Sequence, residues 1–298
     1  MIPLSQGQLT LLETCPRRFK HFFIDGLSGP ASYEQKVKTQ WGAQFHLLMQ
    51  QRSLDLPIEV MSDADAEMMD RLSALAKTAP DIFQYLPISA QASKENVFVQ
   101  SEQRRTFAFN DYLLTVIYDL VIETPTQGQI FDWKTHQQPP RKEWLQTDWQ
   151  TRLYLYVLAE TTALSPEQIS MTYCFVRINE NSPDKTQPDK SQQTPPPSFY
   201  RFSYSAAQHE QTKRDLQALT QTLTSAIAQL KTNQNKPGHH EAFPKIDESK
   251  GLCDRCPFAI RCDRAISTFT GTNRNSDPYH LLRKARQITA ETVEEIPL

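Results

Sequence analysis

Two aspartates and a lysine occur in two runs that otherwise have the composition of buried strands. Asp119 is in the middle of the apolar run 116–122, and Asp132 and Lys134 flank Trp133 in the second run. A buried carboxylate is costly unless it is hydrogen-bonded or holds a cation. Residues two apart on a strand point to the same side, so Lys134 is expected beside Asp132. If the two runs pair as a hairpin, both acids can meet around a hard cation, with an ammonium next to it.

This set of groups suits the hydrolysis of a phosphodiester. A bound Mg²⁺ or Mn²⁺ would polarise the phosphoryl oxygen and lower the pKa of a bound water, and a lysine would orient that water and offset charge in the transition state. The alternative is a buried Asp–Lys ion pair that only holds the hairpin together, and an isolated Asp-x-Lys motif favours this alternative. Alternation along the first strand also predicts that Leu113, Ile117, Asp119 and Val121 share one face.

Three polar residues on predicted helices strengthen the hydrolytic interpretation. Gln150 and Tyr154 are four residues apart, so they face the same way on the helix that follows Lys134. His46 lies on an otherwise apolar helix, where a lone histidine is usually structural. Joined to two carboxylates, however, an imidazole completes a reasonable site for Mn²⁺ or Mg²⁺. Glu102 is a further candidate for the same site.

Four of the five cysteines have a spacing that is typical of metal or cluster ligands. Cys253, Cys256 and Cys262 form a CxxC pair followed by a third cysteine, and Cys15 precedes a proline at a helix junction. In the cytosol a disulfide framework is not expected. One distant cysteine with a compact trio favours a [4Fe–4S] cluster over Zn²⁺, and unligated thiols are the third alternative. Cys174 belongs to a buried strand pattern, where cysteine behaves as a small hydrophobic residue.

Composition sets limits on the class of protein. Hydrophobic residues make up 39% of the 298 residues, as in ordinary globular proteins, and no apolar run reaches the length of a membrane span. The first residues lack the pattern of a signal peptide, so a cytoplasmic location is expected. With a net charge of −2, contact with nucleic acid must come from local basic clusters, the candidates being Arg17, Arg18, Arg141 and Lys142.

The periodicity predicts a mixed α/β core with a central sheet flanked by helices. Helices are expected at 5–20 (interrupted at Pro16), 36–52, 63–78, 80–86, 141–163 and 206–231, and strands beginning at 97 and spanning 112–123, 129–134, 169–177 and 199–204. The expected organisation is a single domain over 1–267, with a helical lobe at about 53–93, a flexible loop at about 179–198, a cysteine-bearing segment at about 245–267, and a tail at 268–298 that is partly disordered.

The ordered set of His46, Asp119, Asp132-Trp133-Lys134 and Gln150-x-x-x-Tyr154 resembles the PD-(D/E)XK nuclease superfamily, specifically its RecB-like branch. The cysteines, with Cys15 opening Cys-Pro-Arg-Arg-Phe, are similar to those of the iron–sulfur members of that branch. The resemblance covers about Ser5 to Asp263. It implies His46, Asp119, Asp132 and the carbonyl of Trp133 as metal ligands, Lys134 as the catalytic lysine, Gln150 and Tyr154 as supports for the lysine and the DNA strand, and a cluster on Cys15, Cys253, Cys256 and Cys262 that joins the two ends of the chain.

The function that the resemblance implies is a Mg²⁺- or Mn²⁺-dependent DNA nuclease, an exonuclease on single-stranded or frayed ends. It would act in DNA repair, recombination or CRISPR adaptation. The chain has no Gly-x-x-x-x-Gly-Lys-Ser/Thr motif, so a helicase or another recombination or CRISPR protein is expected as a separate partner. The alternatives are an inactive DNA-binding or partner module stapled by an iron–sulfur or zinc site, and a zinc-stapled scaffold. Ile117 departs from the family, which often has glycine two residues before the first aspartate.

Overall fold

The computed structural model describes residues 1–27, 33–58, 63–87, 96–135, 141–176, 196–232, 242–253 and 256–264, without the side chains of 33–39 and 63–65. These residues fall into two compact units, Met1–Pro244 and Lys245–Leu298. The division comes where the predicted cysteine-bearing segment begins. Most of the predicted loop 179–198, the end of the predicted helical lobe and the predicted tail 268–298 lie outside the described residues.

The first unit is built on a six-stranded mixed sheet. Its strands are β1 (Ile2–Leu4), β2 (Phe98–Phe109), β3 (Tyr112–Glu123), β4 (Gly128–Lys134), β5 (Ile169–Phe175) and β6 (Ser198–Ser203). The order along the sheet is β1-β3-β4-β5-β6, and β2 also pairs with β3. The β1–β3 and β4–β5 pairs are parallel, whereas the β2–β3, β3–β4 and β5–β6 pairs are antiparallel. The predicted mixed sheet is confirmed, but β1 was missed because three residues are too short a run to show alternation.

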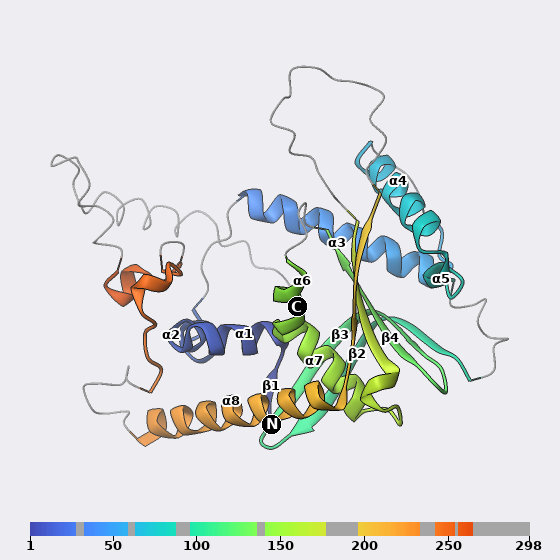
Figure 1. Ribbon diagram of the computed structural model, residues 1–298. Helices are drawn as coiled ribbons and strands as arrows, with labels where there is room; N and C mark the ends of the chain where they lie inside the picture. Colours follow the sequence, from blue (N-terminus) through green and yellow to red (C-terminus); the bar gives the residue numbers. More distant parts are fainter. Residues whose placement is uncertain are drawn as a thin grey trace, which may run out of the picture. The chain divides into compact units, whose positions relative to one another are not determined.

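Helices cover both faces of the sheet (Figure 1). They are α1 (Gln6–Thr14), α2 (Pro16–Phe19), α3 (Tyr33–Ser53), α4 (Asp63–Thr78), α5 (Pro80–Phe83), α6 (Lys142–Thr147), α7 (Trp149–Glu160) and α8 (Ala206–Thr232). One apolar core joins the sheet to α1, α7 and α8, and a second joins it to α3, α4 and α5. Among the described residues, no helix combines the length and the apolar character that crossing a membrane requires.

Two helix interruptions have local causes. Pro16 lacks a backbone N–H and starts α2, and Cys15 before it is extended with φ −155°, as the sequence predicts. The single helix predicted over 141–163 is wrong, because it divides into α6 and α7 at Asp148. The Asp148 side chain accepts the backbone N–H of Gln150 at 2.7 Å and so caps a new helix. The first turn of α7 is therefore fixed where Gln150 stands.

Candidate active site

The site is centred on a fork in the sheet. Pairing between β3 and β4 ends at Leu120 and Phe131, and beyond this point the two strands separate. The next residues along them are Asp119 and Asp132. The Oδ2 atom of Asp119 accepts the backbone N–H of Trp133 at 2.7 Å. A side chain thus replaces the strand partner that this amide loses at the fork.

The side chains of β3 change faces within the site. Tyr118 and Val121 both pack in the core with α1, α7 and α8, whereas Leu120 packs in the core with α3, α4 and α5. The predicted common face of Leu113, Ile117, Asp119 and Val121 is therefore wrong at Val121. The cause is a local distortion opposite Asp119, where Glu102 of β2 has a left-handed φ of 48°. A positive φ is strained for a non-glycine residue, and such strain is concentrated at functional sites.

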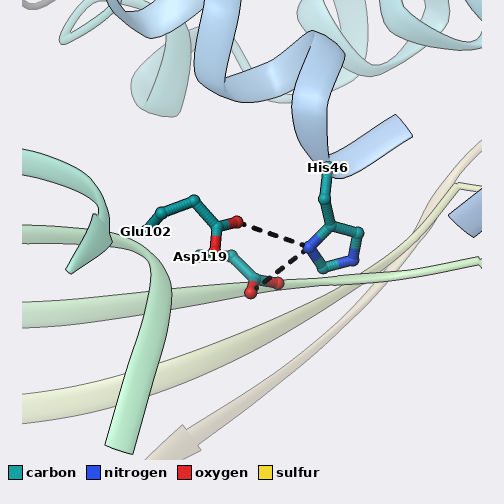
Figure 2. Close-up of side chains that lie close together, drawn as sticks. All are labelled: His46, Glu102 and Asp119. Carbon is teal, nitrogen blue, oxygen red and sulfur yellow. Dashed lines mark ion pairs between the residues drawn. The ribbon is translucent and has the colours of Figure 1, made fainter. Parts of the chain in front are cut away.

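The distortion brings Glu102 to the same place as His46 and Asp119 (Figure 2). The Nδ1 atom of His46 lies 3.4 Å from Oδ1 of Asp119 and 3.6 Å from Oε1 of Glu102. One ligand atom from each of the three residues lies within 4.8 Å of the others. Three elements, α3, β2 and β3, contribute one side chain each. Asp132, predicted as a ligand from the sequence, is not part of this group.

The histidine is oriented by the backbone of β4. Its Nε2 lies 3.0 Å from the carbonyl oxygen of Trp133, which can only accept, so the Nε2–H donates. The carbonyl of Trp133, predicted as a metal ligand, here orients the imidazole. Nδ1 then presents either a lone pair or a second proton to the two carboxylates. Two carboxylate oxygens and a nitrogen lone pair are the donor set of a divalent cation.

The charges around His46 lead to the same conclusion. Burial alone would lower the pKa of His46, but the facing carboxylates of Asp119 and Glu102 outweigh it and raise this pKa to about 10. The two carboxylates thus favour positive charge at this position. A Mg²⁺ or Mn²⁺ ion between the same three groups would supply that charge, so the residues fit the metal that the sequence predicts.

Asp132, Lys134 and Gln150 form a second cluster beside the first. The ammonium of Lys134 is 2.6 Å from Oδ1 of Asp132 and donates to Oε1 of Gln150 at 2.8 Å. The amide nitrogen of Gln150 donates to Oδ2 of Asp132 at 2.6 Å. Asp132 and Lys134 share a side, as alternation predicts, while Trp133 packs into the opposite core. Burial and the Asp119 carboxylate both raise the pKa of Asp132, and Lys134 opposes them.

One oxygen of Asp132, Oδ1, faces the Lys134 ammonium at 2.6 Å. Oδ1 is buried, and no donor among the described residues is aligned to hydrogen-bond it, although the Lys134 ammonium is in contact. Tyr154, one turn after Gln150, is also buried, and the carboxylates of Asp132 and Asp119 join burial in raising its pKa. Its hydroxyl is therefore neutral. Gln150 and Tyr154 lie four residues apart on α7 and so share the helix face that the spacing predicts.

Two residues that the sequence did not single out position this cluster. The ring of Tyr173 on β5 lies 5.0 Å from the Lys134 ammonium, measured to the ring centroid. The Tyr173 hydroxyl is 2.8 Å from Oγ1 of Thr151. Thr151 gives its own proton to the carbonyl of Leu145, at 2.5 Å, so Tyr173 is the donor to Thr151. The sequence did not indicate this role, because Tyr173 has the pattern of an ordinary core residue.

A glycine lets α3 approach the end of β4. A Cβ atom on Gly42 would stand 2.8 Å from Oγ1 of Thr135, the residue after Lys134. Real Cβ atoms essentially never approach so closely, so an alanine at this position would require Thr135 or α3 to shift. His46 is one turn further along α3, so a shift of the helix at Gly42 would move the imidazole relative to the acids.

The predicted DNA-contacting residues have different environments. Arg17 is 5% exposed, and its Nε donates to the carbonyl of Phe243 at 2.7 Å, so its buried guanidinium does not suit a phosphate contact. Arg18 is half-buried, with its guanidinium 5.6 Å from the centroid of the Phe22 ring. Arg141 and Lys142 are exposed, as the prediction requires. Ile117, which stands where the family often has glycine, has a side chain that is 45% exposed.

The predicted cluster cysteines divide between the two units. Half-buried Cys15 belongs to the first unit, and Cys253, Cys256 and Cys262 belong to the second. In the second unit, the backbone N–H of Cys256 donates to the carbonyl of Cys253 at 3.0 Å, and Arg264 donates to the Cys253 sulfur at 2.8 Å. Within the described residues, the cysteine sulfurs do not form a group of three as tight as His46, Glu102 and Asp119. Cys174 is fully buried, and burial raises the pKa of its thiol.

The carboxylate–imidazole cluster and the adjoining Asp-x-Lys pair supply the groups that metal-dependent hydrolysis of a phosphodiester uses. The family model of the PD-(D/E)XK nuclease superfamily matches residues 3–263, and the chain belongs to this superfamily. The predicted superfamily is thereby confirmed.

The chain also resembles proteins of known structure. A protein of Eubacterium rectale, named provisionally as an exonuclease, is 13% identical, with 90% of this chain and 93% of that chain covered and a TM-score of 0.43. The protein SSO0001 is 10% identical, with 89% and 87% covered and a TM-score of 0.34. No curated protein matches significantly.

Proposed function

We propose that this protein is a Mg²⁺- or Mn²⁺-dependent deoxyribonuclease that acts on single-stranded or frayed DNA ends. The observation that carries the proposal is the position of Lys134. Its ammonium is held between Asp132 and Gln150, beside the cluster of His46, Glu102 and Asp119. A buried ion pair that only stabilised a hairpin would need neither the left-handed Glu102 nor a histidine aimed at two carboxylates.

The residues divide into a group that would hold the metal and a group that would act on the attacking water and the phosphate. His46, Glu102 and Asp119 would hold the cation, and Asp132 would stand beside them on β4, paired with Lys134. When bound, the cation polarises the phosphoryl oxygen and makes a bound water more acidic. Lys134 orients the attacking water and offsets the charge that develops on the phosphoryl oxygens. Gln150 fixes both Lys134 and Asp132, because its amide bonds to each of them.

The finer assignments rest on the resemblance of the motifs to the RecB-like branch. We assign exonuclease action on this basis, and the provisional name of the Eubacterium rectale protein agrees with it. We also place a [4Fe–4S] cluster, with Zn²⁺ as the alternative, on Cys15, Cys253, Cys256 and Cys262. In this proposal the enzyme acts in DNA repair, recombination or CRISPR adaptation, together with a separate helicase or other DNA-processing protein.

The test is digestion of end-labelled single-stranded and duplex DNA by protein purified without oxygen. We expect cleavage with Mg²⁺ or Mn²⁺, loss of cleavage with a chelator, and a ladder that shortens from an end of the single strand. Absence of cleavage with either metal, from folded protein, would refute the nuclease and favour a module that binds DNA without cutting it.

A further inference from the structure

The side chain of Trp144 on α6 is 64% exposed, whereas Trp133 and Trp149 are buried. The guanidinium carbon of Arg141 lies 5.3 Å from the centroid of the Trp144 ring, so the cation covers part of one ring face. An exposed aromatic ring with a cation on part of one face can still stack against a second planar group. Nucleic acid bases are such groups, and they stack on aromatic rings when they are unpaired.

The charge around Trp144 suits a polynucleotide backbone. Arg141 and Lys142 are both exposed, and Glu143 is the one acidic residue of α6. The Lys142 ammonium lies 5.6 Å from the centroid of the Phe202 ring. Arg141 thus adjoins the exposed ring and Lys142 adds a second cation on the same short helix. Cations combined with an exposed aromatic ring are the means by which proteins bind single strands without reading their sequence.

The position of α6 is tied to the active site by a chain of contacts. The carbonyl of Leu145, next to Trp144, accepts the hydroxyl of Thr151. Thr151 in turn accepts the hydroxyl of Tyr173, whose ring underlies the Lys134 ammonium. Gln150, adjacent to Thr151, holds both Lys134 and Asp132. A strand that rests on α6 is therefore held at a fixed distance from the residues that would cut it.

We propose that Trp144, with Arg141 and Lys142, is a stacking platform for an unpaired base of single-stranded DNA next to the active site. The inference rests on the proposed nuclease function and narrows it, because a base paired within a duplex has no free face to offer. Single strands and frayed ends then become the preferred substrates through binding at this surface, before any chemistry occurs.

Binding is measured without cleavage, by fluorescence anisotropy of a labelled oligo(dT) with the intact protein and a chelator present. Trp144→Ala should raise Kd by about 5- to 150-fold, the range for loss of one stacked base. Trp144→Phe, which keeps a ring, should retain most of the affinity. Phe98→Ala is the matched control, because Phe98 is also an exposed aromatic residue (43%) but lies at the opposite end of the sheet.

An oligonucleotide of the same length and charge with abasic sites separates stacking from charge. The wild-type protein and Trp144→Ala should bind this probe equally, since no base is present to stack. An unchanged Kd of Trp144→Ala for oligo(dT), or an equal loss on the abasic probe, would overturn the platform. Neither outcome affects cleavage by the wild-type protein, so failure here is distinct from failure of the proposed function.

Discussion

The carboxylate of Asp119 accepts the backbone N–H of Trp133 at 2.7 Å, and this bond fixes the separation of the two strands that carry the acids. It uses Oδ2 and leaves Oδ1 toward His46, 3.4 Å away. The amide would otherwise be a buried donor without a partner, which is costly. One side chain thus completes the sheet at its fork and contributes to the candidate metal site.

Lys134→Ala, Asp132→Asn and Asp119→Asn should each abolish most cleavage while leaving the fold intact. Removal of one preorganised charge stabiliser typically lowers kcat by about 10²- to 10³-fold. The losses should not add in double variants, because the groups act as a unit. Cleavage rates are compared on end-labelled DNA at saturating Mn²⁺, with circular dichroism as the control for folding. Near-normal cleavage by Asp132→Asn would remove it from the catalytic group.

Glu102→Gln tests whether the acid of β2 is a metal ligand. Removal of a residue that only hydrogen-bonds a metal ligand lowers metal affinity roughly 10- to 100-fold. Loss of the Glu102 charge, which would touch the metal itself, should therefore weaken Mn²⁺ binding at least about tenfold. Calorimetric titration with Mn²⁺ measures this directly. Glu160→Gln is the control, because Glu160 on α7 is also a carboxylate paired with a histidine, His209 on α8, at 2.8 Å, but it is not part of the candidate metal site. Equal Mn²⁺ affinity in Glu102→Gln and the wild-type protein would favour the ligand set predicted from the sequence, with Asp132 in place of Glu102.

Gly42→Ala should weaken Mn²⁺ binding by displacing α3, because the added Cβ would meet Oγ1 of Thr135. Elsewhere in a helix, glycine to alanine stabilises by roughly 0.5–1 kcal/mol. Gly7→Ala on α1, where nothing lies within 4 Å, should show that gain in Tm. Adding Thr135→Ala to Gly42→Ala should restore Mn²⁺ affinity, since the clashing oxygen is gone. If Gly42→Ala behaves like Gly7→Ala in both measurements, the close approach has no role in the site.

Cys15→Ala should lose bound iron and thermal stability before it loses activity. Cys174→Ala should keep the cluster. Cys174 is fully buried on β5, so its loss creates only a small cavity, on the order of 1 kcal/mol. Iron and sulfide content and visible absorbance, measured without oxygen, distinguish the two variants. Zinc in place of iron and sulfide would select the other metal on the same cysteines. A full cluster in Cys15→Ala together with a lost cluster in Cys174→Ala would identify Cys174 as the fourth ligand.

Neutralising Arg141 and Lys142 should make DNA binding less sensitive to salt. Each phosphate contact on a single strand contributes about 0.7 to the slope of log Kobs against log[salt], so the slope should fall by roughly one to two units. The variant Arg141→Gln with Lys142→Gln is compared with Lys77→Gln and Lys231→Gln, which remove the same charge from exposed positions near the ends of α4 and α8. The same slope in both double variants would place the DNA elsewhere.

Much of the site follows from local periodicity. Asp132 and Lys134 share a side because strand side chains alternate, and Gln150 and Tyr154 share a side because a helix repeats after about four residues. Pro16 ends α1 at Cys15 because it lacks a backbone donor. Such features depend only on neighbours along the chain, so the sequence predicts them without knowledge of the rest of the fold.

The tertiary structure decided the features that depend on distant neighbours. Glu102, from the sequence only a further candidate, enters the site because its left-handed backbone breaks the alternation of β2 and β3. Arg17 is buried because the carbonyl of Phe243, from far along the chain, comes to lie beside it. Local sequence thus determined which residues carry chemistry, whereas the fork in the sheet decided which of them meet, because strand separation depends on pairing between segments far apart in the chain.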